Sequence, residues 1–307
     1  MIKYLQISKL KGVNTMIYTI ENDNLRVQIS SLGAEMMSIV NKKNGAEYLW
    51  QGNKKYWGGR APNMFPICGR LYEGKYTYLG KEYTMPNHGI ARASELSLGM
   101  AQREKVALVL SSSEKTKEHY PFDFTYTVTF SLKGNTLNIT YTVVNNDTRE
   151  LIFAVGGHPA FNVPINNQGE FSDYYVEFDA PCNAIRVDFS PSCFLTKNDK
   201  EFTMGGTKRI DLRHDLFDND AIFLYNISKG ITLKSDKHKG KVSLKFDGMK
   251  YVGLWHAPKT DAPYLCIEPW TSVPATEGVI DDLLTKDEMM HLPVGYTYRN
   301  GYSITIE

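Results

Sequence analysis

Apolar and polar residues alternate with a period of two along most of this chain. The clearest example is the segment 124–132, in which Phe, Tyr, Val, Phe and Leu alternate with Thr and Ser. The sequence Lys133-Gly134-Asn135 then provides a turn, and the alternation resumes over residues 137–143. Because successive side chains of a strand point to opposite faces, this pattern predicts a β-hairpin with one buried face and one polar face.

Shorter segments of the same kind, separated by turn residues, predict further strands at Leu25–Ile29, Tyr76–Leu79, Val106–Leu110, Val242–Phe246, Tyr251–Trp255 and Tyr302–Ile306. We predict short helices only within Ser111–His119 and Ile280–Met290. Helical segments do not alternate regularly with strands, which disfavours a parallel α/β sheet. The pattern therefore predicts an all-β protein, a large antiparallel β-sandwich with few short helices.

The strand pattern begins at Met16 and continues without a Pro/Gly/Ser-rich linker, an internal repeat or a low-complexity block. We therefore expect a single domain over residues 16–307. Residues 1–15 are expected to be a leader of uncertain order. Their three lysines interrupt the apolar residues, which argues against the apolar core of a signal peptide.

Charge and cysteine content narrow the class of protein. The 35 basic and 34 acidic residues give a formal net charge of +1, so we expect no broad basic field and neither nucleic acid nor a membrane surface as the main partner. The four cysteines show neither CxxC spacing nor the density of a disulfide framework, so we expect them to be reduced thiols. Reduced thiols are typical of cytoplasmic proteins, which is the location that we predict. The oligomeric state is not predicted from the sequence.

Two protonatable side chains stand at the ends of apolar, strand-like segments. His158 lies in Gly-Gly-His-Pro-Ala-Phe-Asn, and Glu268 lies in Cys-Ile-Glu-Pro-Trp. Partial burial raises the pKa of a carboxyl group, which suits a general base. The alternative is a structural salt bridge between Glu268 and Arg70 or Arg92. A His that can protonate and a carboxylate that can accept a proton are what the opening of a sugar ring requires.

Other kinds of catalytic site find little support in the sequence. The chain contains no HExxH, HxH or Cys/His cluster, no Gly-x-Ser-x-Gly elbow and no Gly-rich phosphate loop. We therefore predict no metal, no nucleotide and no other cofactor. Paired carboxylates of a glycoside hydrolase would require a partner for Glu268, and Asp220 is the comparable candidate.

Five motifs together resemble the aldose 1-epimerase, or galactose mutarotase-like, family, and most closely its galactose mutarotase-related branch linked to bacterial lactose operons. They occur in the order Asn63–Arg70, His88–Arg92, Gly157–Asn162, Asp220–Phe223 and Glu268–Trp270. The resemblance covers about residues 16–307. It implies a large antiparallel β-sandwich with a site in a groove on one sheet, in agreement with the alternation described above.

The resemblance also implies roles for individual residues. His158 would be the catalytic acid and Glu268 the base, protonated and ionised respectively, with pKa values on either side of neutral pH. His88 and Arg70 would hold the oxygens of the substrate, and Asp220 would bind a ring hydroxyl. Trp255 begins Trp-His-Ala-Pro, which is similar to an element of the hexose-6-phosphate epimerase branch, and we expect it at the substrate because aromatic rings stack on sugars.

These residues predict a cofactor-independent aldose 1-epimerase, an isomerase that interconverts the α and β anomers of a small-molecule sugar. Arg92 would meet the phosphate of a sugar phosphate, so both a free hexose and a hexose phosphate stay open. Two interpretations are open for the basic residues Lys54, Lys55 and Arg60. They are either further ligands for the phosphate or a cluster of charges exposed to solvent. The alternative functions are a non-catalytic carbohydrate-binding or regulatory module on the same fold and a glycoside hydrolase or lyase.

Overall fold

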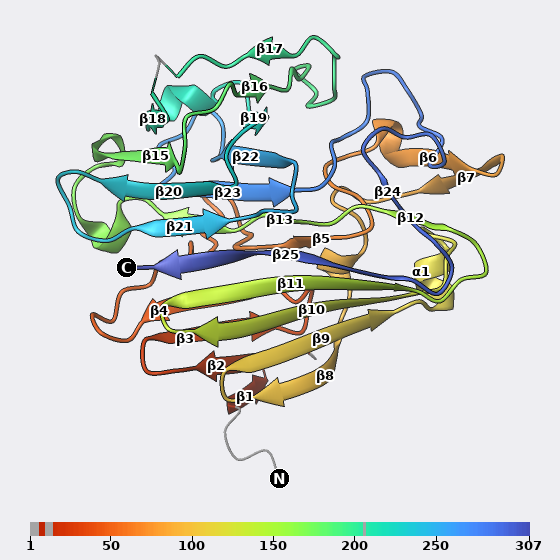
Figure 1. Ribbon diagram of the computed structural model, residues 1–307, viewed down its shortest axis with the longest axis horizontal. Coiled ribbons are helices and arrows are strands. Elements are labelled where there is room, and N and C mark those ends of the chain that lie inside the picture. The colour runs from red at the N-terminus through yellow and green to blue at the C-terminus, as the bar shows by residue number, and fades with distance from the viewer. Residues whose placement is uncertain (1–5, 10–14, 205–206) are drawn as a thin grey trace.

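The computed structural model describes residues 6–9, 15–204 and 207–307 and consists mainly of antiparallel sheets (Figure 1). The largest sheet has nine strands, in the order β18 (Arg209–Asp211), β15 (Tyr174–Phe178), β20 (Gly230–Ser235), β21 (Val242–Lys245), β25 (Thr297–Ile306), β11 (Thr136–Asn145), β10 (Phe124–Lys133), β9 (Lys105–Ser111) and β8 (Ser97–Gln102). Its centre is the predicted hairpin, in which buried and half-buried residues alternate along β10 and β11.

A second, eight-stranded sheet carries most of the sequence motifs. Its order is β17 (Lys200–Glu201), β16 (Ile185–Arg186), β19 (Ile222–Tyr225), β22 (Tyr251–Trp255), β23 (Tyr264–Trp270), β13 (Gly156–Gly157) and β5 (Asn63–Met64), with β14 (Ala160–Asn162) also paired to β23. All seven residues of β23 are buried, which identifies it as a central strand of the molecule.

Smaller sheets complete the architecture. Four strands pair in sequence order as β1 (Gln6–Lys9), β2 (Met16–Glu21), β3 (Leu25–Ser30) and β4 (Met36–Asn41). The hairpin of β6 (Lys75–Tyr78) and β7 (Lys81–Thr84) and the long-range antiparallel pair of β12 (Leu151–Phe153) and β24 (Met290–Leu292) form two two-stranded sheets. The expected leader is thus described only at residues 6–9, which pair with β2, because residues 1–5 and 10–14 lie outside the described residues. The division at residue 16 stays a prediction.

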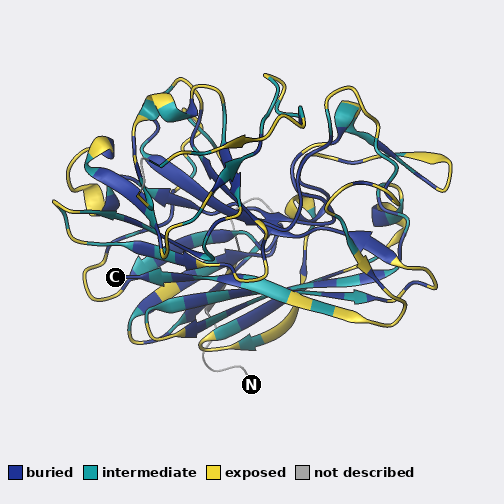
Figure 2. Ribbon diagram, turned by 45° about the horizontal axis from the view of Figure 1, so that its top comes forward, coloured by how far each residue is buried: buried dark blue, intermediate teal, exposed yellow. Residues whose placement is uncertain are grey.

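The two large sheets face each other across a packed interior, as the buried residues in Figure 2 indicate. The hydroxyl of Tyr141 in β11 donates to the Asn63 side-chain oxygen (2.9 Å) and to the Gly156 carbonyl (3.1 Å) of the opposite sheet. Phe65, which follows β5, stacks on Tyr126 of β10 with ring centroids 4.5 Å apart. Since buried polar groups require partners, the tyrosine hydrogen bonds fix the register between the layers. The predicted antiparallel β-sandwich is confirmed.

Helices are few and short in the described residues. The one α-helix, α1 (Glu114–Lys117), lies inside the predicted segment Ser111–His119 and is capped by Ser113. Single 3₁₀ turns occur at Tyr72–Gly74, Ala91–Ala93, Ile165–Asn167, Phe171–Asp173 and His214–Phe217. None of the described helices is long and apolar enough to cross a bilayer.

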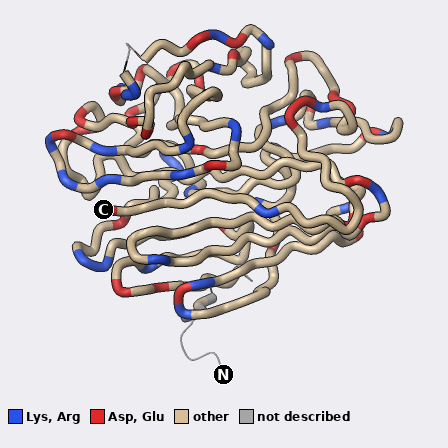
Figure 3. The backbone as a smooth tube through the Cα atoms, viewed as in Figure 1, with Lys and Arg blue, Asp and Glu red and all other residues tan. Residues whose placement is uncertain are grey.

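The helix predicted over Ile280–Met290 is wrong. The backbone there pairs with β6 instead, because the N–H of Leu283 donates to the Thr77 carbonyl (2.8 Å) and the N–H of Thr77 donates to the Asp281 carbonyl (2.9 Å). Turns follow, and Met290 already belongs to β24. Tertiary pairing therefore overrides the local helical propensity. Figure 3 shows basic and acidic residues interspersed over the chain, without a large region of one sign.

Candidate active site

The eight-stranded sheet and the loops above it enclose a cavity of about 280 Å³. All seven residues predicted for the site line it, namely Arg70, His88, Arg92, His158, Asp220, Trp255 and Glu268. The other lining residues are Trp57, Gly69, Asn87, Phe189, Cys193, Ala221, Phe223, Trp270 and Pro274. The sequence motifs, although spread over about two hundred residues, thus converge on one place.

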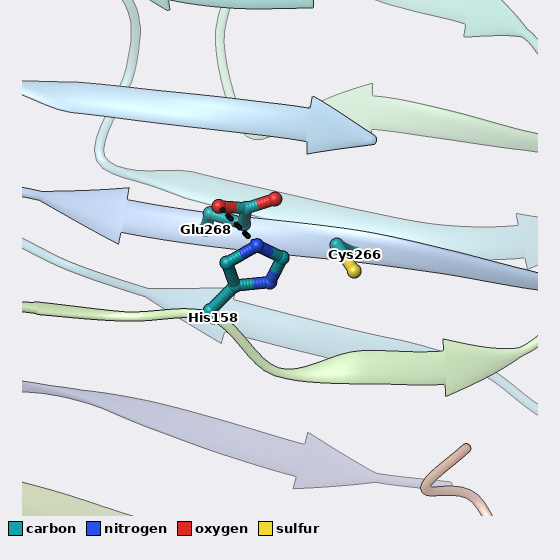
Figure 4. Close-up of side chains that lie close together, drawn as sticks. All are labelled: His158, Cys266 and Glu268. Atoms are coloured by element: carbon teal, nitrogen blue, oxygen red, sulfur yellow. Dashed lines mark ion pairs between the residues drawn. The ribbon is translucent and has the colours of Figure 1, made fainter. Parts of the chain in front are cut away.

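The floor of the cavity is formed by His158 and Glu268 on neighbouring segments of the sheet. Glu268 belongs to the buried strand β23, and His158 lies between β13 and β14, both of which pair with β23. The two side chains meet with Nε2 of His158 3.3 Å from Oε2 of Glu268, as Figure 4 shows. Their side chains are only 11% and 4% exposed, so this pair is largely shielded from water.

Burial governs the proton distribution of this pair. It lowers the pKa of His158 to about 3, with a smaller contribution from the positive charge of Arg92. It also raises the pKa of Glu268 well above its usual value, and the charge of Asp220 adds to this increase. Both shifts favour uncharged side chains, because charge is costly away from water. These directions favour a neutral imidazole and a protonated carboxyl group, whereas the expected pair is a protonated His158 beside an ionised Glu268. In either form the pair holds one proton between its two groups, and the roles of acid and base stay a prediction.

His88 stands beside this pair in a tightly specified loop. Its ring is edge-on to that of His158, with centroids 5.6 Å apart. Burial, reinforced by the positive charges of Arg92 and Arg70, lowers the pKa of His88 well below its usual value. The backbone N–H of Gly69 donates to Nδ1 of His88 (3.1 Å), which leaves the proton of the neutral ring on Nε2. Nε2 of His88 is therefore a hydrogen-bond donor at the cavity.

Gly89 explains why this loop is so restricted. Its φ of +78° is a conformation that other residues rarely adopt, and a Cβ atom there would collide with the Phe65 carbonyl. The N–H of Ile90 donates to the same carbonyl at 2.8 Å. The His88 loop is thus joined to the segment that follows β5, which leads to Arg70.

The polar rim of the cavity is more exposed than its floor. Arg70 and Arg92 are both exposed, and neither forms an ion pair with any described carboxylate. The alternative salt bridge between Glu268 and Arg70 or Arg92 is therefore not seen among the described residues. The Glu268 carboxyl group contacts the imidazole of His158 instead. Asp220 precedes β19 in a turn with a φ of +72°.

Lys54, Lys55 and Arg60 do not line the cavity. Lys55 donates to the Tyr56 hydroxyl (2.7 Å) and lies 3.6 Å from Asp261, whereas Arg60 donates to the Gln51 side chain (2.9 Å). These contacts favour the solvated cluster over further anion ligands.

Aromatic rings surround the His158 imidazole. Trp255, at the end of β22, lies nearly perpendicular to the His158 ring with centroids 5.7 Å apart. Trp57 stacks on the His158 ring with centroids 4.9 Å apart and 25° between the planes. Trp57 was not among the predicted site residues. Its loop carries no strand or motif signal, and its contacts with the site come from distant residues, the rings of His158 and Trp255.

Three potential metal ligands lie together at the cavity floor. Ligand atoms of His158, Cys266 and Glu268 are all within 4.8 Å of one another (Figure 4). These atom types suit Zn²⁺, which prefers a tetrahedral set of N, S and O ligands. Burial, however, raises the pKa of the Cys266 thiol well above its usual value, and a metal-bound cysteine has to lose that proton. The prediction that the site uses no metal stays a prediction.

A family described as aldose 1-epimerase matches residues 16–279. The chain belongs to the aldose 1-epimerase family. Protein LacX of Lactococcus lactis subsp. lactis, in its plasmid form, is 30% identical over 302 residues, which cover 95% of this chain and 99% of the relative. The branch suggested by the sequence motifs agrees with this similarity.

Two solved structures extend the comparison. A galactose mutarotase related enzyme from Lactobacillus acidophilus is 34% identical, with a TM-score of 0.90 over 95% of this chain and 97% of the other. A galactose mutarotase-like protein from Lactobacillus casei ATCC 334 is 30% identical, with a TM-score of 0.88 over 95% of this chain and 100% of the other. Membership of the aldose 1-epimerase family supports an epimerase that acts on a small-molecule sugar.

Proposed function

We propose that this protein is a cofactor-independent aldose 1-epimerase in which His158 and Glu268 open and close the ring of an aldose. The observation that carries the proposal is the 3.3 Å contact between Nε2 of His158 and Oε2 of Glu268 on the floor of the cavity. The ring oxygen and the anomeric hydroxyl of an aldose are bonded to the same carbon. An acid and a base that serve these two oxygens therefore have to be close neighbours.

The single proton shared by the pair is sufficient for the reaction. One partner protonates the ring oxygen while the other accepts the proton of the anomeric hydroxyl, and the C1–O5 bond opens to the aldehyde. Rotation about the C1–C2 bond and reversal of both proton transfers close the ring on its other face. The cycle returns the proton to its original partner, so no net charge has to develop. Such acid–base assistance typically contributes about 10² to 10⁴ in rate.

The surrounding residues suit a sugar substrate. The Nε2–H of His88 and the guanidinium of Arg70 supply hydrogen-bond donors, and Asp220 supplies an acceptor for a ring hydroxyl. The indole of Trp255 supplies an apolar face for the C–H groups of the ring. This combination of donors, an acceptor and aromatic faces supports a hexose.

The rim leaves room for a phosphorylated hexose as an alternative substrate. Arg92 lies on the rim with its guanidinium unpaired by any carboxylate of the described residues. A guanidinium binds phosphate through paired hydrogen bonds. Arg92 would therefore strengthen the binding of a hexose phosphate whose phosphate group extends toward the rim.

Polarimetry of freshly dissolved α-galactose, α-glucose and glucose 6-phosphate, in a buffer that contains no phosphate, tests this function. Acceleration of the optical change for any of the three establishes the epimerase and identifies the substrate class. Heat-unfolded protein is the matched control for catalysis by the buffer. If none of the three reactions is accelerated although calorimetry detects sugar binding, the protein is a carbohydrate-binding module.

A further inference from the structure

The loop 188–196 joins two polar groups on the rim of the cavity. The thiol of Cys193 donates a hydrogen bond to Oδ2 of Asp220. The carbonyl of the preceding residue, Ser192, accepts a hydrogen bond from Nη1 of Arg70 at 3.2 Å. Two consecutive residues of one loop therefore contact both the carboxylate and the guanidinium that the proposed function assigns to the sugar.

This loop is held by the backbone of a neighbouring segment. The N–H of Leu195 donates to the Ala275 carbonyl (2.9 Å), and the N–H of Ala275 donates to the carbonyl of Arg70 (2.9 Å). Within the loop, the N–H of Cys193 donates to the Ser190 carbonyl at 2.9 Å. Because the loop and Arg70 share one hydrogen-bonded frame, the thiol has a defined position relative to the guanidinium.

The backbone at both ends of the thiol–carboxylate contact is unusual. Cys193 has a φ of +62° and Asp220 a φ of +72°, although neither is a glycine. Non-glycine residues in this region carry a conformational cost that the surrounding structure has to offset. Two such residues, in contact through their side chains and at the edge of one cavity, indicate a site that is built rather than incidental.

We propose that Cys193 is a positioning residue that orients the Asp220 carboxylate for the sugar, by occupying Oδ2 and leaving Oδ1 for a ring hydroxyl. This inference rests on the proposed function. In the described residues, Oδ1 of Asp220 accepts no hydrogen bond, whereas the backbone N–H of Asp220 donates to the Phe217 carbonyl (3.0 Å) and fixes the turn. The thiol thus selects which carboxylate oxygen faces the substrate.

The thiol keeps its proton under ordinary conditions. Burial raises the pKa of Cys193 to about 11, and the hydrogen bond to Asp220 and its negative charge contribute further. Cys193 therefore remains a donor at neutral pH, and it is a poor nucleophile, since the thiolate is the reactive form. Its contribution to the reaction is one of orientation and substrate affinity.

Steady-state mutarotation kinetics of Cys193→Ala, Cys193→Ser and the control Cys182→Ala test the role. Loss of a hydrogen bond to a charged group predicts that Cys193→Ala raises KM by about tenfold with little change in kcat. Cys193→Ser keeps a donor and should retain the KM of the wild type. Cys182 lies away from this cavity, so its variant should match the wild type. An unchanged KM in Cys193→Ala, or the same loss in both Cys193 variants, overturns the proposal.

Alkylation gives a readout that does not depend on epimerase activity. Iodoacetamide modification of Cys193, followed by mass spectrometry with Cys182 as the internal reference, is compared in the wild type and Asp220→Asn. Removal of the carboxylate charge lowers the pKa of the thiol, and a decrease of one unit increases the thiolate and the alkylation rate by about tenfold. Equal rates contradict the thiol–carboxylate contact. Faster alkylation in Asp220→Asn of a protein that lacks mutarotation would retain the contact while the proposed function fails.

Discussion

The indole of Trp57 lies nearly parallel to the imidazole of His158, with 25° between the ring planes and centroids 4.9 Å apart. This stacking removes one face of the imidazole from water. Desolvation is the main reason that the pKa of His158 falls to about 3, and Trp57, from a distant loop, contributes to that desolvation.

Replacement of Trp57 by Leu should therefore raise the pKa of His158 toward its ordinary value of 6.5. The imidazole would then bind a second proton in mildly acidic solution, and the dyad would lose the acceptor that the reaction requires. We expect the acid limb of the rate–pH profile to move to higher pH in this variant, with a smaller displacement in Trp57→Phe, which keeps a ring. A profile identical to that of the wild type would remove Trp57 from this role.

The His158–Glu268 pair should account for most of the catalysis. His158→Ala and Glu268→Gln are each expected to slow mutarotation by at least about 10²-fold, because each removes one proton-transfer partner. His291→Ala is the matched control, since His291 is exposed and bonded to Glu150 rather than to the cavity. Full activity in either dyad variant, with an unchanged circular dichroism spectrum, would refute the assignment.

The same pair predicts a characteristic dependence of stability on pH. With ordinary values of 6.5 and 4.5 in the unfolded chain, the unfolded pair holds two protons below pH 4.5, one between 4.5 and 6.5, and none above 6.5. The folded pair holds one proton throughout, from about pH 3 up to the raised pKa of Glu268. Burial of these groups therefore opposes folding least between pH 4.5 and 6.5, and the cost of burying them grows as the pH moves away from this window on either side.

This dependence is measurable by urea unfolding of the wild type and of a His158→Gln, Glu268→Gln double variant. The difference in unfolding free energy should decrease by at most about 1.4 kcal/mol per pH unit above pH 6.5 and again below pH 4.5. The double variant removes both titrations and keeps similar side-chain sizes. A difference that is constant from pH 3 to pH 8 would show that the two groups have ordinary pKa values in the folded protein.

Arg92 should distinguish a phosphorylated sugar from a free one. Arg92→Ala is expected to raise KM for glucose 6-phosphate by about tenfold or more and to leave KM for the free sugar nearly unchanged, because a charge-assisted hydrogen bond is lost only with the phosphate. Arg103→Ala is the control, as Arg103 is paired with Asp23 on another part of the surface. Equal losses for the two sugars would remove the phosphate-binding role.

A chelator should leave the activity unchanged. Proton transfer by His158 and Glu268 requires no metal, and the thiol of Cys266 is held in its protonated form by burial. Mutarotation is compared before and after dialysis against EDTA. A loss of activity that added Zn²⁺ restores would mean that His158, Cys266 and Glu268 act as ligands.

The sequence predicted those features of the fold and the site that depend on local patterns of residues. The alternation over residues 124–143 predicted β10 and β11, because side-chain period and turn residues are local properties. His158 and Glu268 could be found because each combines a titratable group with neighbouring glycine or proline at the end of an apolar segment, whereas the binding roles of the other five residues came from the resemblance to the aldose 1-epimerase family. Placing them around one cavity required the pairing of β13 and β14 with β23, which no local pattern contains.

The failures have equally physical causes. The segment Ile280–Met290 has helical composition, but hydrogen bonds with Thr77 hold its first residues against β6. Trp57 and Cys193 lie in loops whose contacts with the site come from other parts of the chain, His158 for Trp57 and Asp220 for Cys193. The burial of the dyad, which shifts both of its pKa values toward the uncharged forms, depends on packing that the sequence does not display.

Gly89 has a consequence for how this protein can change in evolution. Almost any substitution there would push the His88 loop away from the Phe65 carbonyl and displace His88 from its place beside the His158–Glu268 pair. The exposed guanidinium of Arg92, three positions further on, has no such constraint. Mutations that alter sugar preference should therefore accumulate at the rim, where each costs little stability, and new specificities can arise in this lineage without rebuilding the chemistry beneath them.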